Sequence, residues 1–136
     1  MNLTQRLLVA IFIFCYAPTL MAQTHISTSL ALIQRVLPKH AQHFKVETLS
    51  ATKNLDCFEL ESQNDKIILR GNNGVAVASA LYHYLTEYAH CQVTWNGSNL
   101  NLPATLPLIK QKVVKETPYS FRYYLNYCTF NYTMSW

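Results

Sequence analysis

The first candidate for a chemical site is a group of side chains of the types that bind metal ions. His83, Glu87 and His90 fall at positions i, i+4 and i+7 of an expected helix, with Cys91 next in the chain, and such spacing can hold a metal ion. The group does not form the HExxH pattern. It also lies opposite the expected apolar stripe of the helix, where polar residues face solvent. We therefore expect a solvated polar face, with no metal ion and no cofactor.

Carboxylate pairs are the second candidate, because hydrolases use them as acid, base or nucleophile. The sequence predicts no apolar pocket that would raise the pKa of one carboxyl group above that of another. We therefore expect all the acidic side chains to lie solvated on the surface. The sequence contains no GxSxG motif, and no Ser or Cys has a clear His partner. It therefore predicts no catalytic residue within this chain. The acidic residues are Glu47, Asp56, Glu59, Glu61, Asp65, Glu87 and Glu116.

A glycine-bounded turn, Gly71-Asn72-Asn73-Gly74, precedes the same expected helix. Glycine-rich turns in this position can cradle a phosphate group. This one lacks both the GxGxxG pattern and the Lys-Ser/Thr pair of a P-loop. We predict instead a strand-to-helix turn, in which Asn72 or Asn73 is the N-cap of the helix.

The last 18 residues are rich in aromatic rings and amides, with one basic residue, Arg122, and no acidic one. Residues such as Tyr124, Asn126, Tyr127 and Asn131 are typical of carbohydrate sites, where rings contact C–H faces and amides bind hydroxyl groups. The alternative is a strand that is buried on both faces, as in a parallel sheet. A strand that ends at the rim of an active site satisfies both interpretations. The aromatic residues are Tyr119, Phe121, Tyr123, Tyr124, Tyr127, Phe130, Tyr132 and Trp136.

Composition limits the class of protein that positions these residues. The chain is 50% hydrophobic and 13% charged, which is typical of one small globular domain and not of a disordered chain. With only 3 Gly and 5 Pro, it is not a collagen or a low-complexity repeat. The net charge of +4 includes no run of basic residues, so we expect no nucleic-acid partner.

The N-terminus has the features of a secretory signal peptide. Arg6 is followed by the apolar run 7–15 and then by the small residue Ala22, and such a run is too short to span a bilayer comfortably. We predict that residues 1–22 are removed, and that the protein is exported, either periplasmic or secreted, with no membrane contact after cleavage. An uncleaved membrane anchor is the alternative.

Three cysteines remain after residue 22, namely Cys57, Cys91 and Cys128. An odd number cannot pair completely, and no CxxC pair indicates a zinc or redox site. One disulfide bond and three buried free thiols both fit this pattern, so the two alternatives stay open.

Apolar periodicity predicts the elements of an α+β domain. Helical spacing predicts one helix over 26–37, ended by Pro38, and a second over 74–88. Alternating residues predict strands and turns, and we expect a small, mostly antiparallel sheet with both helices on one side. The expected strands and turns are 44–48, a hairpin of 58–60 with 67–69, and a hairpin turn at Asn96-Gly97. The expected apolar stripe of the second helix is Gly74, Ala78, Leu81, Leu85 and Tyr88.

Two segments carry a family resemblance: GNNGVAVASALYHYLTEYAHCQVTWNGSNLNLP, and the terminal ETPYSFRYYLNYCTFNYTMSW. They resemble the start of the α-N-acetylglucosaminidases, glycoside hydrolase family 89, and the likeness runs from about Ser27 to Trp136. The resemblance implies a small α/β domain over 23–117, followed at 118–136 by the unfinished first strand of a catalytic TIM-type barrel. The rest of that barrel and an all-helical domain are then the missing partners of this chain, which would be the N-terminal piece of a larger protein.

The same resemblance implies an activity and a site. The family hydrolyses glycans that end in α-linked N-acetylglucosamine by a retaining mechanism, with two glutamates from later barrel strands that lie outside this chain. Its Asn-x-Cys at the end of the first strand contacts the terminal sugar and matches Asn126 and Cys128, and Tyr132 is a further candidate for the pocket wall. That position agrees with the rule that barrel sites lie at the carboxyl ends of strands. The alternatives are a stand-alone, non-catalytic carbohydrate-binding or interaction module of the same fold, and a purely structural domain.

Overall fold

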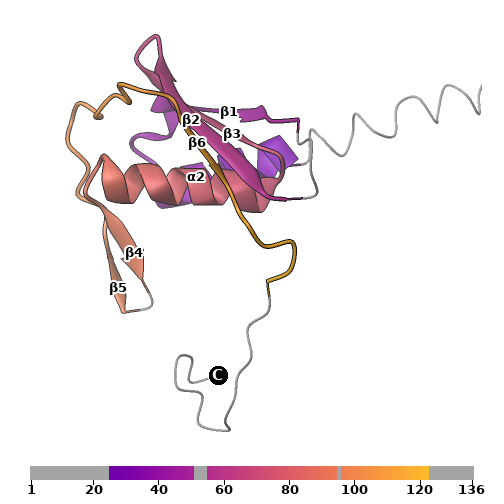
Figure 1. Ribbon diagram of the computed structural model, residues 1–136. Coiled ribbons are helices and arrows are strands. Elements are labelled where there is room, and N and C mark those ends of the chain that lie inside the picture. The colour runs from indigo at the N-terminus through magenta and orange to yellow at the C-terminus, as the bar shows by residue number, and fades with distance from the viewer. Residues whose placement is uncertain (1–24, 51–54, 95, 123–136) are drawn as a thin grey trace, which may run out of the picture.

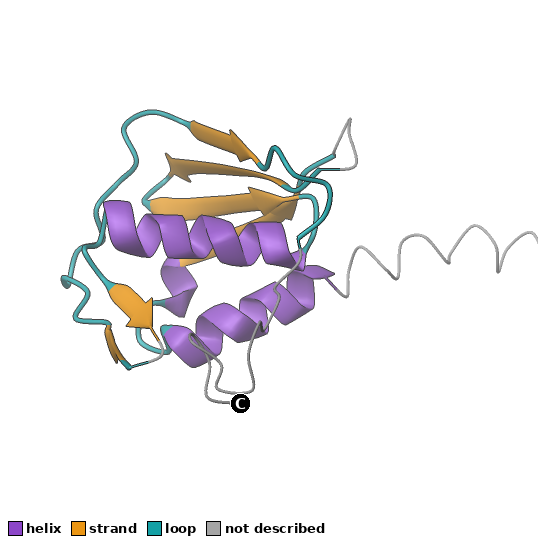
Figure 2. Ribbon diagram, turned by 60° about the horizontal axis from the view of Figure 1, so that its bottom comes forward, coloured by secondary structure: helices purple, strands orange, loops and turns teal. Residues whose placement is uncertain are grey.

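The structure is a computed structural model that describes residues 25–50, 55–94 and 96–122. The predicted signal peptide over 1–22 and the candidate sugar-binding residues Asn126, Cys128 and Tyr132 lie outside the described residues. Within them, a four-stranded sheet has both helices against one face, so the α+β architecture is confirmed (Figures 1 and 2). Among the described residues, no helix is long and apolar enough to cross a membrane.

A helix covers residues 25–36, close to the predicted 26–37. Its end is set by Pro38, because proline cannot continue a helix, and the amide of Leu37 still donates to the carbonyl of Ile33 at 2.8 Å. Ile33 and Leu37 are buried in the core. Leu30, which shares the helical spacing of Ile33 and Leu37, is 43% exposed, while the neighbouring Ser29 is buried, so the buried stripe of this helix is rotated towards Ser29.

The sheet has the strand order β1-β3-β2-β6, and two of its three pairings are antiparallel. The predicted hairpin is confirmed as β2 and β3, joined by Asn64 and Asp65 with φ of 49° and 60°, a conformation that these two residue types tolerate well. β1 lies parallel to β3. The edge strand β6 was not predicted, because its sequence, VVKE, is short and largely polar. The strands are β1 (Phe44–Thr48), β2 (Cys57–Gln63), β3 (Lys66–Gly71) and β6 (Val113–Glu116).

The second helix is α2 (Gly74–Glu87), as predicted, but its buried face differs from the expected stripe. Gly74 is exposed and Ala78 only partly buried, while Tyr84 is fully buried and its hydroxyl donates to the carbonyl of Pro107 at 3.0 Å. The buried band is wide because α2 shares one core with both the sheet and the N-terminal helix. Its buried residues are Ala76, Val77, Ala80, Leu81, Tyr84 and Leu85.

A small separate hairpin, β4 (Gln92–Thr94) with β5 (Gly97–Asn99), is present where the turn at Asn96-Gly97 was predicted, but Gly97 is already the first residue of β5 and pairs with Thr94. Gly97 has a φ of 154°. The described residues of both strands are exposed. Leu100 and Leu102, which follow the hairpin, pack against the main core. A single 3-10 turn, η1 (Ala41–His43), leads into β1.

Candidate functional site

The predicted polar face of α2 is only partly solvated. His83 is half-buried, with its ring 5.8 Å from that of Phe58 and 6.4 Å from that of Tyr88. Burial lowers the pKa of His83, and the nearby charge of Lys115 lowers it further. The prediction of a solvated face is therefore wrong for this residue, because the rings of Phe58 in β2 and of Tyr88 pack beside its own. Over the ranges that the structure describes, no three His, Cys, Asp or Glu side chains are grouped to hold a metal ion.

Three of the carboxylates predicted to be free on the surface are instead paired on the outer face of the sheet. Arg70 in β3 binds Glu47 at 2.6 Å, lies 3.6 Å from Glu59, and forms an ion pair with Glu61. The strand register explains this grouping, since Glu47 and Glu59 are the neighbours of Arg70 across β1 and β2. The hydrogen bond from Lys45, and then that from Arg70, lower the pKa of Glu47. Carboxylates neutralised in this way are poor general acids.

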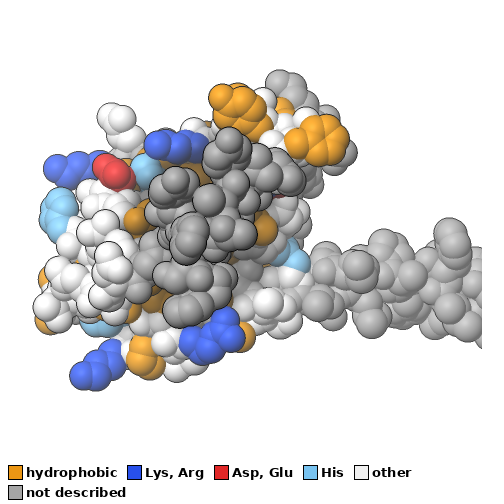
Figure 3. All heavy atoms as spheres, turned by 90° about the horizontal axis from the view of Figure 1, so that it is seen from below, with side chains coloured by type: hydrophobic (Ala, Val, Ile, Leu, Met, Phe, Trp, Pro, Cys, Tyr) orange, Lys and Arg blue, Asp and Glu red, His pale blue; other side chains and the backbone are white. Residues whose placement is uncertain are grey.

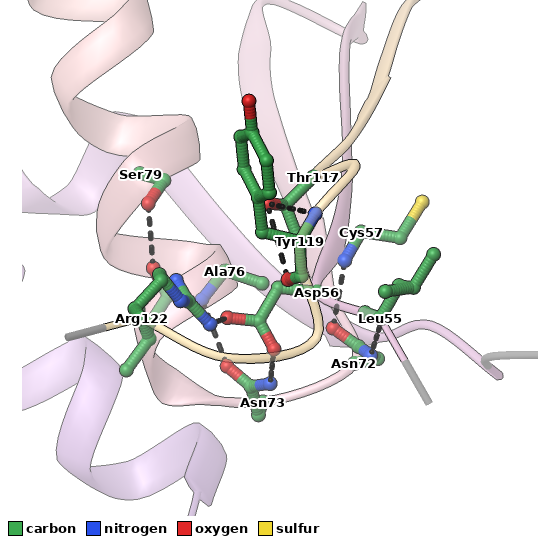
Figure 4. A network of polar contacts seen from close by, with 11 residues as sticks. Leu55, Asp56, Cys57, Asn72, Asn73, Ala76, Ser79, Thr117, Tyr119 and Arg122 are labelled. Atoms are coloured by element: carbon green, nitrogen blue, oxygen red, sulfur yellow. Dashed lines mark hydrogen bonds and ion pairs between the residues drawn. The ribbon is translucent and has the colours of Figure 1, made fainter. Parts of the chain in front are cut away.

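On the opposite side of the sheet, the start of α2 organises a second set of polar contacts. Asn73 is the N-cap, as predicted: its Oδ1 accepts from the amide of Ala76 at 2.9 Å. Its Nδ2 donates to Oδ1 of Asp56 at 2.7 Å. The other carboxylate oxygen of Asp56 forms an ion pair with Arg122. Figure 4 shows the Asp56 carboxylate between Asn73 and Arg122.

Asp56 therefore holds the segment that leaves the domain at two points. Its side chain binds Arg122, and its backbone carbonyl accepts from the amide of Thr117 at 2.9 Å. The hydrogen bond from Arg122, followed by that from Asn73, keeps the pKa of Asp56 below its ordinary value. We call Asp56, Asn73, Thr117 and Arg122 the exit network, because they join the start of α2 to the last described residues of the chain.

The neighbouring residue of the turn, Asn72, ties it to the start of β2. Its Oδ1 accepts from the amide of Cys57 at 3.0 Å, and its Nδ2 donates to the carbonyl of Leu55 at 2.8 Å. Gly71 is needed for the close approach, because a Cβ there would lie 2.8 Å from the backbone nitrogen of Val77. The amides of the turn are thus used to build the fold, which confirms the prediction of a strand-to-helix turn.

One hollow adjoins the exit network, and a second lies next to the first. The first, of about 200 Å³, is lined by Asp56, Arg122 and the first turns of α2. The second is a wider groove of about 550 Å³ that follows the outer side of α2. Phe58, Ser79 and Lys115 line both, so the two hollows are continuous. The first has the carboxylates of Asp56, which is paired with Arg122, and of Glu116, and the second has His83 and Glu87. No nucleophile with an activated base is present there, so the arrangement fits binding or positioning and not bond cleavage.

The described cysteines do not add a nucleophile. Cys57 and Cys91 are free thiols. Burial raises the pKa of both, and for Cys57 the charges of Glu116 and Glu59 raise it further. The thiolate is the reactive form, so neither is activated. Cys128 lies outside the described residues.

Two functional arrangements were missed from the sequence. Arg70 could have been located, because Glu47, Glu59 and Glu61 occupy polar positions of alternating strands, where a central cation would stabilise them. The pair of Asp56 with Arg122 joins residues 66 positions apart, and no local pattern signals such a contact. Arg122 is the described residue closest in sequence to Asn126, four positions before it.

Comparison with known proteins gives one consistent result. The family described as "Alpha-N-acetylglucosaminidase (NAGLU) N-terminal domain" matches residues 27–108. The human protein "Alpha-N-acetylglucosaminidase" is 38% identical over 111 residues, which are 78% of this chain and 15% of that protein. The chain thus spans about 15% of the length of the curated relative that it matches.

Solved structures of family 89 glycoside hydrolase from Clostridium perfringens are similar as well. One, in complex with 2-acetamido-1,2-dideoxynojirmycin, has a TM-score of 0.76 and 34% identity, and covers 85% of this chain and 14% of that one. Another holds "its substrate GlcNAc-alpha-1,4-galactose", with a TM-score of 0.71 and 35% identity, and covers 82% of this chain and 13% of that one.

Proposed function

Because this chain belongs to the family of α-N-acetylglucosaminidase N-terminal domains, we propose that it is the N-terminal portion of an exported exo-glycosidase that removes terminal α-linked N-acetylglucosamine. The observation that carries the proposal is the joint match of sequence and fold, at 34% identity and a TM-score of 0.76, to a family 89 glycoside hydrolase. The related structure with bound GlcNAc-α-1,4-galactose supports the substrate class.

The mechanism that we propose is retaining, with two glutamates supplied by the part of the protein beyond this chain. Such enzymes need two carboxyl groups about 5 Å apart, one as nucleophile and one as acid and base. Within the described residues, Glu47, Glu59 and Glu61 bind Arg70 on the outer face of the sheet, and Asp56 binds Arg122. These four carboxylates have structural partners, which supports placing the catalytic pair downstream.

We further propose that residues 118–136 begin the catalytic barrel and that Asn126 and Cys128 bind the terminal sugar, with Tyr132 in the same pocket wall. An amide both donates and accepts hydrogen bonds, as recognition of sugar hydroxyls requires. The 23–117 segment is then the small domain that precedes the barrel. Residues 1–22 direct export, so the enzyme is periplasmic or secreted, and mass spectrometry of the mature protein should find Gln23 at its N-terminus.

The activity is tested on the full-length protein that contains this domain, with an aryl α-N-acetylglucosaminide as substrate. We expect turnover, and proton NMR of the first product should show the α-anomer. The separate 136-residue chain should release no aryl group. Release of the β-anomer would contradict the retaining mechanism, and binding of the glycan without turnover by the full-length protein would support the alternative, a non-catalytic carbohydrate-binding module.

A further inference from the structure

Apolar side chains are exposed to solvent in the groove along α2. Val75 is 57% exposed and Tyr82 45% exposed, and both line the groove together with Phe58 and His83. Exposed apolar side chains that gather in one groove with polar residues at its rim are typical of an interaction site. Lys115 of β6 closes the far side of the groove.

The chain leaves the domain beside this groove. Arg122 lines the adjoining hollow, and the preceding Tyr119 and Phe121 are 69% and 90% exposed. Figure 3, which looks onto the helical side, shows hydrophobic side chains standing out at one edge of this face. Aromatic side chains exposed to this degree are enriched where proteins bind one another.

The exit network fixes the segment from Thr117 to Arg122 to the domain, so this segment is a short tether and not a free linker. Asp56 holds both Thr117 and Arg122, so the last described residue, Arg122, is fixed in the hollow next to the groove. The matched solved structure is about seven times as long as the part this chain covers, since that part is 14% of its length. A short, fixed tether gives the two parts a high effective concentration for each other.

We propose that the groove formed by Phe58, Val75, Tyr82, His83 and Lys115 is the docking surface for the downstream catalytic part of the same polypeptide. The proposal rests on the proposed function in one respect, namely that a catalytic barrel follows this domain. The docked partner is an apolar surface of that barrel, which covers the exposed side of α2. The exit network then sets the orientation in which the two meet.

The test compares two valines of equal exposure on opposite faces. Val75 lies in the groove and Val114 in β6, where it pairs with Glu59 on the outer face of the sheet, and each is 57% exposed. Val75→Cys and Val114→Cys are made separately in the full-length protein and labelled with a maleimide. Labelling is quantified at those two positions alone by peptide mass spectrometry, and denatured protein supplies the rate without protection.

We expect the native protein to label position 75 about tenfold or more slowly than position 114, which corresponds to about 1.4 kcal/mol of protection. Equal rates at the two positions would overturn the proposal. Protection that disappears on dilution would overturn it as well, because it would assign the groove to a second copy of the protein. Labelling does not depend on turnover, so protection in a protein without glycosidase activity would sink the proposed function and leave the docking surface standing.

Discussion

At the scale of single residues, the described part of the chain uses its charged and polar side chains to hold structure. Arg70 gathers three glutamates on the outer face of the sheet, and Asp56 joins Asn73 to Arg122. Exposed ion pairs contribute little to stability. The value of the Asp56 pair therefore lies mainly in the position that it imposes on the segment leaving the domain.

Asp56→Asn tests this pair through its pH dependence. The pKa of Asp56 is lowered from 3.8 in the folded protein, so its contribution to stability is present above the unfolded value and is lost as the pH falls through the folded one. Urea denaturation at neutral pH should find the variant less stable than the parent chain. The difference should shrink as the pH falls below 3.8, the unfolded value, and through the lower folded one. A difference that is the same at every pH would show that the charge is not involved.

Tyr84→Phe tests a buried hydroxyl at the other end of the pH scale. Burial raises the pKa of Tyr84 from 10.0 to about 12, so its contribution to stability is complete below pH 10 and is lost as the pH rises towards 12. At neutral pH the variant should be destabilised by about 1 kcal/mol, because the carbonyl of Pro107 loses its donor. Between pH 10 and 12 the parent chain should lose the stability that the variant keeps. Parallel curves over that interval would contradict the assignment.

At the scale of elements, one close contact determines how α2 sits on the sheet. β3 ends at Gly71, where an added Cβ would meet the Val77 side chain and backbone nitrogen at 2.8 Å each. Helix and strand therefore approach more closely than any side chain at position 71 would allow. The same turn supplies the N-cap Asn73, so one short segment both ends the strand and begins the helix.

Gly71→Ala should be destabilising by about 1–3 kcal/mol, because the backbone of α2 must move to admit the methyl group. Gly74→Ala is the matched control: its Cβ would meet only Nδ1 of His25 at 3.5 Å, and alanine favours a helix more than glycine does. Thermal unfolding of both variants measures the difference. If the two melt together at or above the parent temperature, the close approach at position 71 does not constrain the fold.

At the scale of the whole molecule, none of the described residues forms an acid–base pair of the kind that a glycosidase needs, and the chain spans about 15% of the curated relative that it matches. It joins a docking groove to an exit network, and the sugar-binding residues that we propose follow four to ten positions after Arg122. We propose that the domain positions the beginning of the barrel. Its own polar residues need not touch the substrate.

Asn126→Ala in the full-length protein tests the proposed sugar contact. Loss of a hydrogen bond in a dry pocket costs about 1–3 kcal/mol, so kcat/KM should fall by about tenfold to a hundredfold. Cys128→Ser, which keeps the shape, should have a smaller effect. Melting temperatures of the same preparations serve as the control. A lowered melting temperature with unchanged kcat/KM would mean that Asn126 caps a strand and does not bind the sugar.

The sequence by itself determined the elements that local patterns encode. Alternation in β1 and β2, helical spacing before Pro38, and the turns at Gly71–Gly74 and Asn96-Gly97 each depend on neighbours within a few positions. The same patterns predicted an α+β domain, and the family resemblance added its place before a catalytic barrel. These features were predictable because propensity, capping and turn chemistry act over short distances.

Only the tertiary structure decided which distant residues meet. The pairing of β6 with β2, the three glutamates around Arg70, and the contact of Asp56 with Arg122 join segments far apart in the chain. The burial of His83 and the rotated buried band of α2 follow from the same packing. Helical periodicity identifies an apolar face only approximately, because the width of that face depends on how many partners pack against it, and here the sheet and the N-terminal helix both do.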